Sequence, residues 1–419
     1  MKIPRLQQLL VCRPLLSDPV LRHLTDFFDG EKGDDAAYDF AAALVRAAER
    51  WGLAGNVVSG YLLCRLVLDE NLVAGIMEQQ KGRVGKSVRA AFVHDIALLE
   101  PLLREHPSTY LPFDFLDAYV PTGMRVDDVQ EGAAALFAVL SRPWTADSLA
   151  DALLDHYRRY GSGDMAIYRA FRWDQEKKLV GIENFAPIRL TNLIGYMEQK
   201  QALLSNTLAF LSGRPANNVL LVGARGTGKS SSVKALANEF FSQGLRLVQL
   251  TKPQFSELPR IMRTLRRFGT KHFIVYLDDL SFEESDPEYK TLKSGIEGGV
   301  ETRPDNVLLY ATSNRRHLVK ESWHDRDGAD DVHRNDSVNE TISLSDRFGL
   351  VIDYRAPNEK EYLAIIDHYL RAADVTLTPE ELRLLGQRWE MGHSGLSGRS
   401  ARQFVDHYLG QRGAKDEPR

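Results

Sequence analysis

Apolar residues recur every three or four positions through much of the first 170 residues. In Tyr38–Trp51 this spacing places Phe40 and Leu44 on one face of a helix and the charged side chains on the opposite face. Comparable segments follow at Val57–Leu68, Ala90–Arg104, Gly132–Leu140 and Ala146–Tyr160. No run in this part alternates between apolar and polar residues as a half-buried strand would. The pattern therefore predicts an α-helical domain over residues 1–170.

The pattern changes after residue 170. Residues 171–215 combine an irregular stretch, expected to be a linker or a short hairpin, with an amphipathic helix over Leu193–Leu211. Short apolar runs then alternate with helices expected from near Gly228, Pro253 and Asp286; the runs are Val219–Val222, Leu245–Leu250, His272–Leu277, Val307–Ala311 and Leu350–Asp353. Such runs are typical of a buried parallel sheet with helices on both faces, so residues 216–356 are predicted to form a three-layer α/β domain. Residues 357–419 are predicted to be helical, over Glu359–Ala372, Pro379–Trp389 and Ser397–Gly410.

Composition indicates an ordinary soluble globular protein. The chain has 419 residues, 43% of them hydrophobic and 26% charged, and a net charge of −4 that neither favours nor opposes nucleic acid as a partner. Its two cysteines, Cys12 and Cys64, cannot build a disulfide framework and lack metal-ligand spacing. The N-terminus lacks the pattern of a signal peptide, and the most apolar stretch, Gly55–Cys64, is too short to span a bilayer. We therefore expect a cytoplasmic protein with no membrane partner.

The clearest chemical motif is the glycine-rich turn within Asn218–Ser232 (NVLLVGARGTGKSSS). It fulfils the phosphate-loop pattern G-x-x-x-x-G-K-[ST] between an expected strand and an expected helix. Glycines in such a loop adopt positive φ, so backbone N–H groups point inward at phosphate oxygens, and the helix N-terminus adds its dipole. Lys229 would reach the β- and γ-phosphates, and the Ser230 hydroxyl would bind Mg²⁺. The predicted nucleotide-binding residues are Gly223, Ala224, Arg225, Gly226, Thr227, Gly228, Lys229, Ser230 and Ser231.

Polar side chains end two further strands of the expected sheet. His272–Asp279 (HFIVYLDD) ends in two carboxylates, at the edge where open α/β sheets bind ligands. We expect Asp278 to hold Mg²⁺ through its water shell, and Asp279 to orient or deprotonate an attacking water. Val307–Arg316 (VLLYATSNRR) ends near Asn314, whose neutral amide could hold that water or a γ-phosphate oxygen. With the phosphate loop, these residues predict a hydrolytic site for a magnesium–nucleotide complex.

Two arginines could complete such a site. Arg347, in the sequence SLSDRFG before the last strand, could be presented to the nucleotide of a neighbouring subunit and stabilise charge on the transferred phosphoryl group. The alternative is an internal ion pair with Asp346. Arg399, in the sequence GLSGRSARQF that opens the terminal helix, could sense the γ-phosphate. Arg402, one turn later on nearly the same face, is its alternative.

Together these motifs resemble those of the AAA+ superfamily of ring-forming ATPases. The resemblance implies a Walker A motif at Gly223–Ser230, a Walker B motif at Asp278 and Asp279, sensor 1 at Asn314, an arginine finger at Arg347 and sensor 2 at Arg399. It also implies that Ile194 lies near the adenine and that the helices after Pro357 form a lid. ATP, Mg²⁺, a homo-oligomeric ring and an unidentified protein partner are implied in the same way. Longer stretches, among them LIGYMEQKQALLSNTLAFLSGRPANNVLLVG and SGRSARQFVDHYL, are similar to one bacterial AAA+ family, domain of unknown function 815.

One position departs from the superfamily pattern. Walker B motifs usually end in Asp-Glu, whereas this chain has Asp278-Asp279. Aspartate is one methylene shorter, about 1.5 Å, and misplacing a catalytic group by ~1 Å can cost on the order of a hundredfold in rate. Either the loop compensates, Glu283 or Glu284 substitutes, or hydrolysis is slow and the protein acts as a nucleotide-dependent switch. A DNA-associated motor or loader is a further alternative.

Two charged segments have competing interpretations. Four arginines at helical spacing make a partly basic face, interpreted as a solvated helix face in preference to a nucleic-acid patch; they are Arg260, Arg263, Arg266 and Arg267. The insertion His317–Ser337 holds three histidines among several aspartates. Its loose spacing favours a mobile loop near a subunit interface over a metal site.

Overall fold

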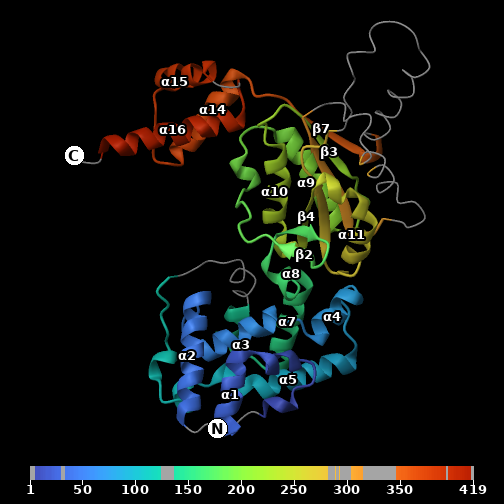
Figure 1. Cartoon of the computed structure of the whole chain (residues 1–419), viewed down its shortest axis with the longest axis vertical. Coiled ribbons are helices and arrows are strands. Elements are labelled where there is room, and N and C mark those ends of the chain that lie inside the picture. Colours follow the sequence, from blue (N-terminus) through green and yellow to red (C-terminus); the bar gives the residue numbers. More distant parts are fainter. Residues whose placement is uncertain are drawn as a thin grey trace.

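The structure is a computed structural model that describes residues 5–29, 34–123, 136–281, 288, 292, 303–314, 346–392 and 395–416. Several predictions fall outside these residues: the first part of Gly132–Leu140, the helix expected from Asp286, the acids Glu283 and Glu284, and the insertion His317–Ser337. Figure 1 shows three parts along the long axis: N-terminal helices, a sheet with flanking helices, and C-terminal helices.

The N-terminal part is a group of helices around one apolar core. Its helices are α1 (Pro19–Asp29), α2 (Asp34–Trp51), α3 (Val57–Leu68), α4 (Leu72–Gln79), α5 (Lys86–Arg104), α7 (Ala146–Arg159) and the short α8 (Asp164–Ile167). Asn56 and Asn71 begin α3 and α4, because their side chains accept hydrogen bonds from backbone N–H groups of the first turn. The predicted helical character is confirmed, and α1 and α4 are added to it.

Seven strands of the described residues form one sheet, in the order β2-β1-β4-β5-β6-β3-β7. They are β1 (Ala170–Asp174), β2 (Lys178–Gly181), β3 (Val219–Gly223), β4 (Leu245–Leu250), β5 (His272–Leu277), β6 (Val307–Ser313) and β7 (Leu350–Tyr354). All neighbours pair in parallel except β1 and β2. For the irregular stretch after residue 170 the sequence predicted either a linker or a short hairpin. The structure shows the hairpin, which extends the sheet.

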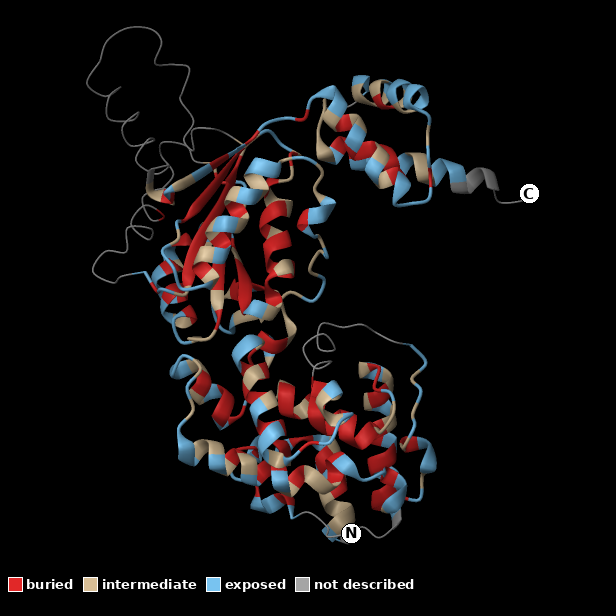
Figure 2. Ribbon diagram, turned by 180° about the vertical axis from the view of Figure 1, so that it is seen from behind, coloured by how far each residue is buried: buried red, intermediate tan, exposed pale blue. Residues whose placement is uncertain are grey.

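Helices cover both faces of the sheet. α9 and α10 pack on one face and α11 on the other; their bounds are Met197–Leu211, Lys229–Glu239 and Leu258–Leu265. Alternate residues of β3 serve opposite faces, with Val219 and Leu221 on the first and Leu220 and Val222 on the second. Figure 2 shows the strands as largely buried. The predicted three-layer α/β fold is confirmed, and its parallel strands bring their carboxyl ends to one edge.

The C-terminal helices enclose an apolar cluster of their own. They are α14 (Glu359–Arg371), α15 (Pro379–Met391) and α16 (Gly398–Asp416). Asn358 and Thr378 start α14 and α15 with capping boxes. Ile194, in the segment before α9, packs against this cluster and so ties the C-terminal helices to the segment leading into the sheet. Among the helices of the described ranges, none is both long and apolar enough to span a membrane.

Two buried cations fix the N-terminal helices to the sheet. The guanidinium of Arg246, at the start of β4, donates hydrogen bonds to the carbonyl oxygens of Tyr160 (2.8 Å) and Met165 (2.7 and 3.0 Å). Lys271, just before β5, donates to the carbonyl of Tyr157 at 3.0 Å. Both cations cap the end of α7, where unpaired carbonyls favour positive charge. The N-terminal helices are thus held at the amino edge of the sheet, opposite the phosphate loop.

Candidate nucleotide site

The phosphate loop connects β3 to α10. Gly226 and Gly228 adopt φ values of +77° and +93°, and Gly223 has φ +135°. A Cβ atom on Gly223 would lie 2.0 Å from the carbonyl oxygen of Tyr354, so no side chain fits there. α10 begins at Lys229, and the N–H groups of a first helical turn have no intrahelical acceptors. This local structure presents backbone N–H groups suited to phosphate oxygens.

The side chain of Lys229 folds back onto the loop. Its Nζ donates hydrogen bonds to the carbonyls of Gly223 and Ala224, both at 2.7 Å, and to Asn314 Oδ1 at 3.1 Å. Burial lowers the pKa of Lys229, while the two carboxylates at the end of β5 act in the opposite direction. The contact with Asn314 joins the loop to the end of β6, so two residues predicted from separate motifs meet.

Asp278 is the most heavily hydrogen-bonded carboxylate of the site. Its Oδ1 accepts hydrogen bonds from the hydroxyls of Ser230 (2.8 Å), Tyr276 (2.5 Å) and Thr312 (2.7 Å). Burial raises the pKa of Asp278, but the hydrogen bonds from these hydroxyls outweigh it, so the net shift is downward. The carboxyl is therefore ionised at neutral pH. Ser230 and Asp278, the residues predicted to hold Mg²⁺, lie side by side.

Asp279 has a left-handed backbone, with φ +52°. This conformation costs a non-glycine residue on the order of 1 kcal/mol, although aspartate tolerates it better than most. The Asp279 N–H donates to Thr312 Oγ1 at 2.9 Å, and its Oδ1 accepts a hydrogen bond from Asn314 Nδ2 at 2.5 Å. Asn314 thus bridges Asp279 and Lys229.

These groups line one cavity of about 930 Å³. Of the residues predicted to bind nucleotide or metal, those on its wall are Ile194, Arg225, Gly226, Thr227, Gly228, Lys229, Ser230, Ser231, Asp278, Asp279, Asn314 and Arg399. Gly223 and Ala224 do not line it; their carbonyls bind Lys229 instead. The opposite wall is largely apolar and includes Ile188, Leu193, Ile365 and Tyr369. The cavity therefore has a polar end at the phosphate loop and an apolar end between the segment before α9 and the C-terminal helices.

The C-terminal helices touch the phosphate loop directly. A Cβ atom on Gly226 would lie 3.0 Å from Ser397 and 3.1 Å from Arg399 Cβ, so the glycine permits this close approach. Arg402 also lines the cavity, but its guanidinium lies 4.9 Å from the centre of the Tyr369 ring and its Nε bonds a neighbouring carboxylate. Of the two arginines considered from the sequence, Arg399 is the one that approaches the loop.

Arg347 lies elsewhere. It belongs to the short turn Asp346–Phe348 before β7 and is not among the residues that line the cavity. β7 runs parallel to β3, with Leu350 beside Val219 and Tyr354 beside Gly223. A five-residue strand spans roughly 16 Å, so Arg347 lies at the opposite edge of the sheet from its own phosphate loop.

Two residues of the site were missed by sequence reasoning. Tyr276 lies inside the apolar run of β5, where it resembles a core residue, yet its hydroxyl reaches Asp278 two positions later. Residues two apart point to the same side of a strand, and that rule could have identified it. Thr312, two positions before Asn314, lies on the same side of β6 as Asn314; its hydroxyl donates to the Asp278 carboxylate and accepts a hydrogen bond from the backbone N–H of Asp279.

A protein-family profile described as "Protein of unknown function (DUF815)" matches residues 166–412, more than half of the chain. The chain belongs to this family. The match covers the sheet, the phosphate loop and the C-terminal helices, and it leaves out nearly all of the N-terminal helices. Among curated proteins, none has a sequence similar enough to match this DUF815 chain.

Two solved structures resemble the DUF815 chain distantly. The Thermotoga maritima RuvB Holliday junction branch migration motor is 18% identical, with a TM-score of 0.37 over 52% of this chain and 63% of that chain. C. elegans PCH-2 is 19% identical, with a TM-score of 0.37 over 55% of this chain and 65% of that chain. The match thus spans less than two thirds of either relative. Likeness at this level supports no conclusion about what the chain binds or does.

Proposed function

We propose that this chain is an AAA+ ATPase that binds Mg²⁺–ATP beside its phosphate loop and hydrolyses it. The observation that carries the proposal is the meeting of Lys229 and Ser230 with the polar ends of β5 and β6 in one cavity. A cavity at the carboxyl edge of a parallel sheet, with converging polar groups, is the usual place for a ligand in such folds.

The residues at the loop fit a magnesium ion. Ser230 Oγ and Asp278 Oδ1 lie 2.8 Å apart, so both oxygens can face one cation or its water shell. The three hydroxyls around Asp278 keep it ionised and fix its direction. When bound, Mg²⁺ would neutralise charge on the phosphates.

The same cavity fits a nucleotide. The N–H groups of the loop and of the first turn of α10 would hold the phosphates, and Lys229 would exchange its carbonyl contacts for phosphate oxygens. The apolar end, with Ile194 and Ile365, would receive the adenine ring. Arg399 would approach the terminal phosphate from the C-terminal helices.

Asp279 and Asn314 would act on the attacking water. Their hydrogen bond fixes both side chains beside Lys229, where a γ-phosphate would lie. In the proposed reaction Asp279 Oδ accepts the proton of the water, and Asn314 orients that water. The same hydrogen bond, with the short side chain of Asp279, also favours a second candidate: a switch that binds ATP tightly and turns it over slowly.

We place Arg347 in the site of a neighbouring copy within a homo-oligomeric ring. Its position at the far edge of the sheet supports action on another subunit's nucleotide, because it cannot reach its own.

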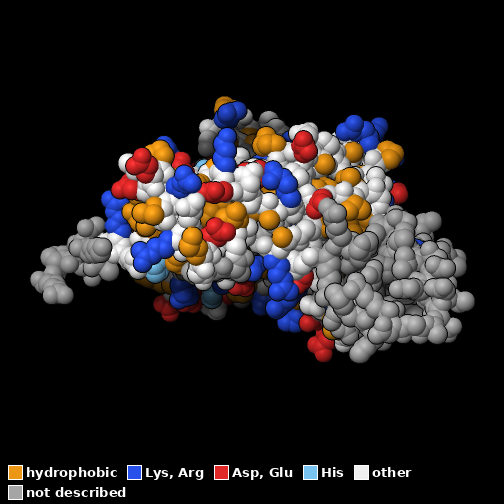
Figure 3. Space-filling model, turned by 90° about the horizontal axis from the view of Figure 1, so that it is seen from above, with side chains coloured by type: hydrophobic (Ala, Val, Ile, Leu, Met, Phe, Trp, Pro, Cys, Tyr) orange, Lys and Arg blue, Asp and Glu red, His pale blue; other side chains and the backbone are white. Residues whose placement is uncertain are grey.

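Figure 3 views the end that carries the C-terminal helices, where basic and acidic side chains are interspersed. That face gives no support to the DNA-motor alternative. The partner that the ring would act on is expected to be a protein.

The test is phosphate release from mixed variants. Lys229→Ala should abolish ATP binding, and Arg347→Ala should bind ATP without turnover, so each protein alone is inactive. Mixing them should restore part of the activity, because an intact site and an intact arginine then meet across an interface. A mixture that stays inactive, although both proteins co-assemble, contradicts the role of Arg347. Tight ATP binding by the unaltered chain without phosphate release supports the switch instead.

A further inference from the structure

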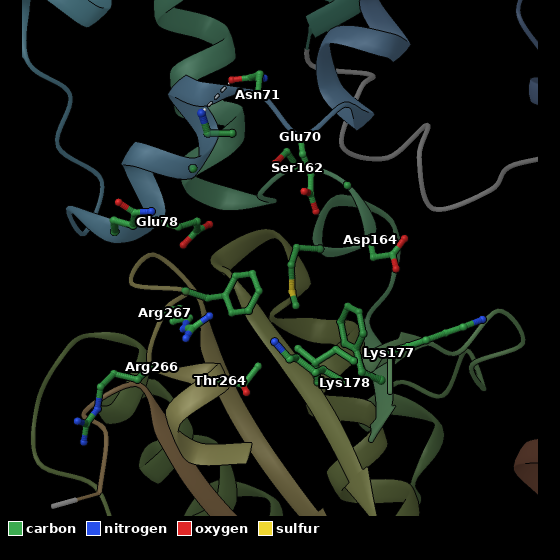
Figure 4. A pocket seen from close by; sticks show the side chains of 18 residues that line it. Glu70, Asn71, Glu78, Ser162, Asp164, Lys177, Lys178, Thr264, Arg266 and Arg267 are labelled. Atoms are coloured by element: carbon green, nitrogen blue, oxygen red, sulfur yellow. Dashed lines mark hydrogen bonds between the residues drawn. The ribbon is translucent and has the colours of Figure 1, made fainter. Parts of the chain in front are cut away.

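A second cavity, of about 1030 Å³, separates the N-terminal helices from the sheet. We call it the waist groove; its walls come from α4 with the loop before it, the connection from α7 to β1, the β1–β2 hairpin and the end of α11. Figure 4 shows Glu70 and Asp164 on the side of the helices, with Lys178 and Arg267 facing them from the sheet. None of the described residues lines both this groove and the nucleotide cavity.

The floor of the waist groove is apolar. Phe171 and Met165 are buried, and Leu179 and Phe268 are partly buried against the same core. Ala74 of α4 adds to the floor from the opposite side. A ligand here could therefore bury an apolar side chain against Leu179 and Phe268, which are still partly exposed.

The two walls carry opposite charge. Lys177, Lys178 and Arg267 are exposed on the side of the sheet, and Glu70 and Asp164 are exposed on the side of the helices. Across the described residues, Lys178, Arg267 and Glu70 take part in no ion pair. The sheet side thus offers cations that an acidic ligand could pair with, while the carboxylates opposite oppose a polyanion.

One end of the waist groove is fixed by Glu78. Its carboxylate accepts hydrogen bonds from the Thr270 N–H (2.9 Å) and hydroxyl (2.7 Å), and it lies 3.0 Å from the buried ammonium of Lys271. The Glu78 carbonyl also accepts a hydrogen bond from the Gly269 N–H at 3.0 Å. These contacts join α4 to the start of β5, so the groove is preformed and binding would not have to order it.

The edge of the sheet also borders the waist groove. Among the described strands β2 pairs only with β1, so the peptide groups on its other edge serve no neighbouring strand. Extended peptides add to such edges through main-chain hydrogen bonds, and their alternate side chains point to one face. Here that face holds the apolar floor.

We propose that the waist groove binds an extended segment of a partner protein in which an apolar residue is flanked by acidic residues. The apolar residue packs on Leu179 and Phe268, and the acidic residues pair with Lys178 and Arg267. A nucleic acid carries a phosphate at every nucleotide, which would lie against Glu70 and Asp164, and it has no apolar side chain for the floor, whereas the peptide places its few carboxylates on the side of Lys178 and Arg267. The proposal does not depend on ATP hydrolysis, because no part of the groove belongs to the nucleotide site.

The test is fluorescence anisotropy with the nucleotide-free full-length chain. The probes are labelled nonapeptides with phenylalanine, leucine, isoleucine, methionine or tryptophan at the centre and aspartate or glutamate on both sides. Labelled peptides with lysine or arginine as flanking residues, and a labelled single-stranded DNA of about twenty nucleotides, are measured in the same way for comparison. We expect saturable binding of at least one acidic peptide and at least tenfold weaker binding of its basic counterpart.

Two kinds of variant locate the binding. The double variant Lys178→Glu with Arg267→Glu reverses two charges of the groove, and its matched control, Arg214→Glu with Arg263→Glu, reverses two exposed charges outside the groove. Gly75→Trp fills the groove from α4, and Gly410→Trp is its control; a Cβ atom meets nothing within 4 Å at either glycine. Thermal melting checks that each variant is folded.

Both groove variants should weaken the acidic peptide at least tenfold, and both controls should leave it within twofold. Absence of saturable binding for every acidic peptide overturns the proposal. So does equal binding of the basic peptides, or binding that is unchanged in folded groove variants. Tight DNA binding that is lost in the charge-reversed variant would assign the groove to nucleic acid instead.

Discussion

Replacing Thr312 by valine removes one hydroxyl that contacts both acidic residues of the nucleotide site: the carboxylate of Asp278 and the backbone N–H of Asp279. That hydroxyl donates to Asp278 Oδ1 at 2.7 Å and accepts the Asp279 N–H at 2.9 Å. A hydrogen bond to a charged group contributes about 1.5–3 kcal/mol. If this stabilisation is lost only in the transition state, turnover slows by about 10- to 160-fold, since each 1.36 kcal/mol is a factor of ten. Asp279 should be affected most, because its left-handed backbone loses the acceptor that holds it.

The assay is steady-state phosphate release at saturating ATP and Mg²⁺, with binding of a fluorescent ATP analogue measured in parallel. We expect Thr312→Val to lower kcat by the factor above and to raise the Mg²⁺ concentration needed for half-maximal rate, while nucleotide binding changes little. Thr312→Ser keeps the hydroxyl and should retain most of the activity. Thr207→Val removes another buried hydroxyl, which bonds Tyr310 and Leu203, and controls for lost stability. A kcat within threefold of the unaltered chain, or a serine variant as slow as the valine variant, would refute this reasoning.

Three further predictions follow from the geometry. Gly226→Ala should weaken ATP binding at least tenfold, because its Cβ would press on Ser397, whereas Gly213→Ala has a similar φ of +67°, an open surrounding and no expected effect on binding. Asp279→Glu should not speed phosphate release, since the left-handed backbone suits aspartate better than glutamate; a faster enzyme would contradict this role for the backbone. Burial lowers the pKa of His272 to about 4, below its value in the unfolded chain. The neutral imidazole of His272 therefore contributes on the order of 3 kcal/mol to the free energy of unfolding above pH 6.5, and this contribution is lost as the pH falls towards 4. His272→Phe should accordingly flatten the fall in melting temperature over that range.

The strands of the sheet were the most predictable part of the fold. β4 and β5 have the bounds expected from Leu245–Leu250 and His272–Leu277, because strands buried on both faces form nearly continuous apolar runs, interrupted in β4 by Arg246 and Gln249. The hairpin of β1 and β2 was harder to predict, since it is short, lies at the edge of the sheet and mixes charged with apolar residues. α4 was missed because it is only eight residues long.

The site was predictable at the level of motifs but not of contacts. The phosphate loop, Asp278 and Asn314 follow from spacing along the chain, and their meeting at one edge follows from parallel strands. That Thr312 hydrogen-bonds the same carboxylate oxygen as Tyr276 depends on the register of β5 against β6, which spacing does not give. The waist groove could not be foreseen at all, because its walls come from segments up to about two hundred positions apart that meet only through the docking of α4 and α7 on the sheet.

The most direct test of the proposed function is to measure ATP binding and phosphate release side by side for three proteins. We predict that the unaltered chain binds a fluorescent ATP analogue and releases phosphate only with Mg²⁺. Lys229→Ala should lose binding, and Asp279→Asn should keep it while releasing phosphate at least a hundredfold more slowly. An unaltered chain that does not bind ATP in the presence of Mg²⁺, or phosphate release that survives in Lys229→Ala, would contradict the assignment of this site.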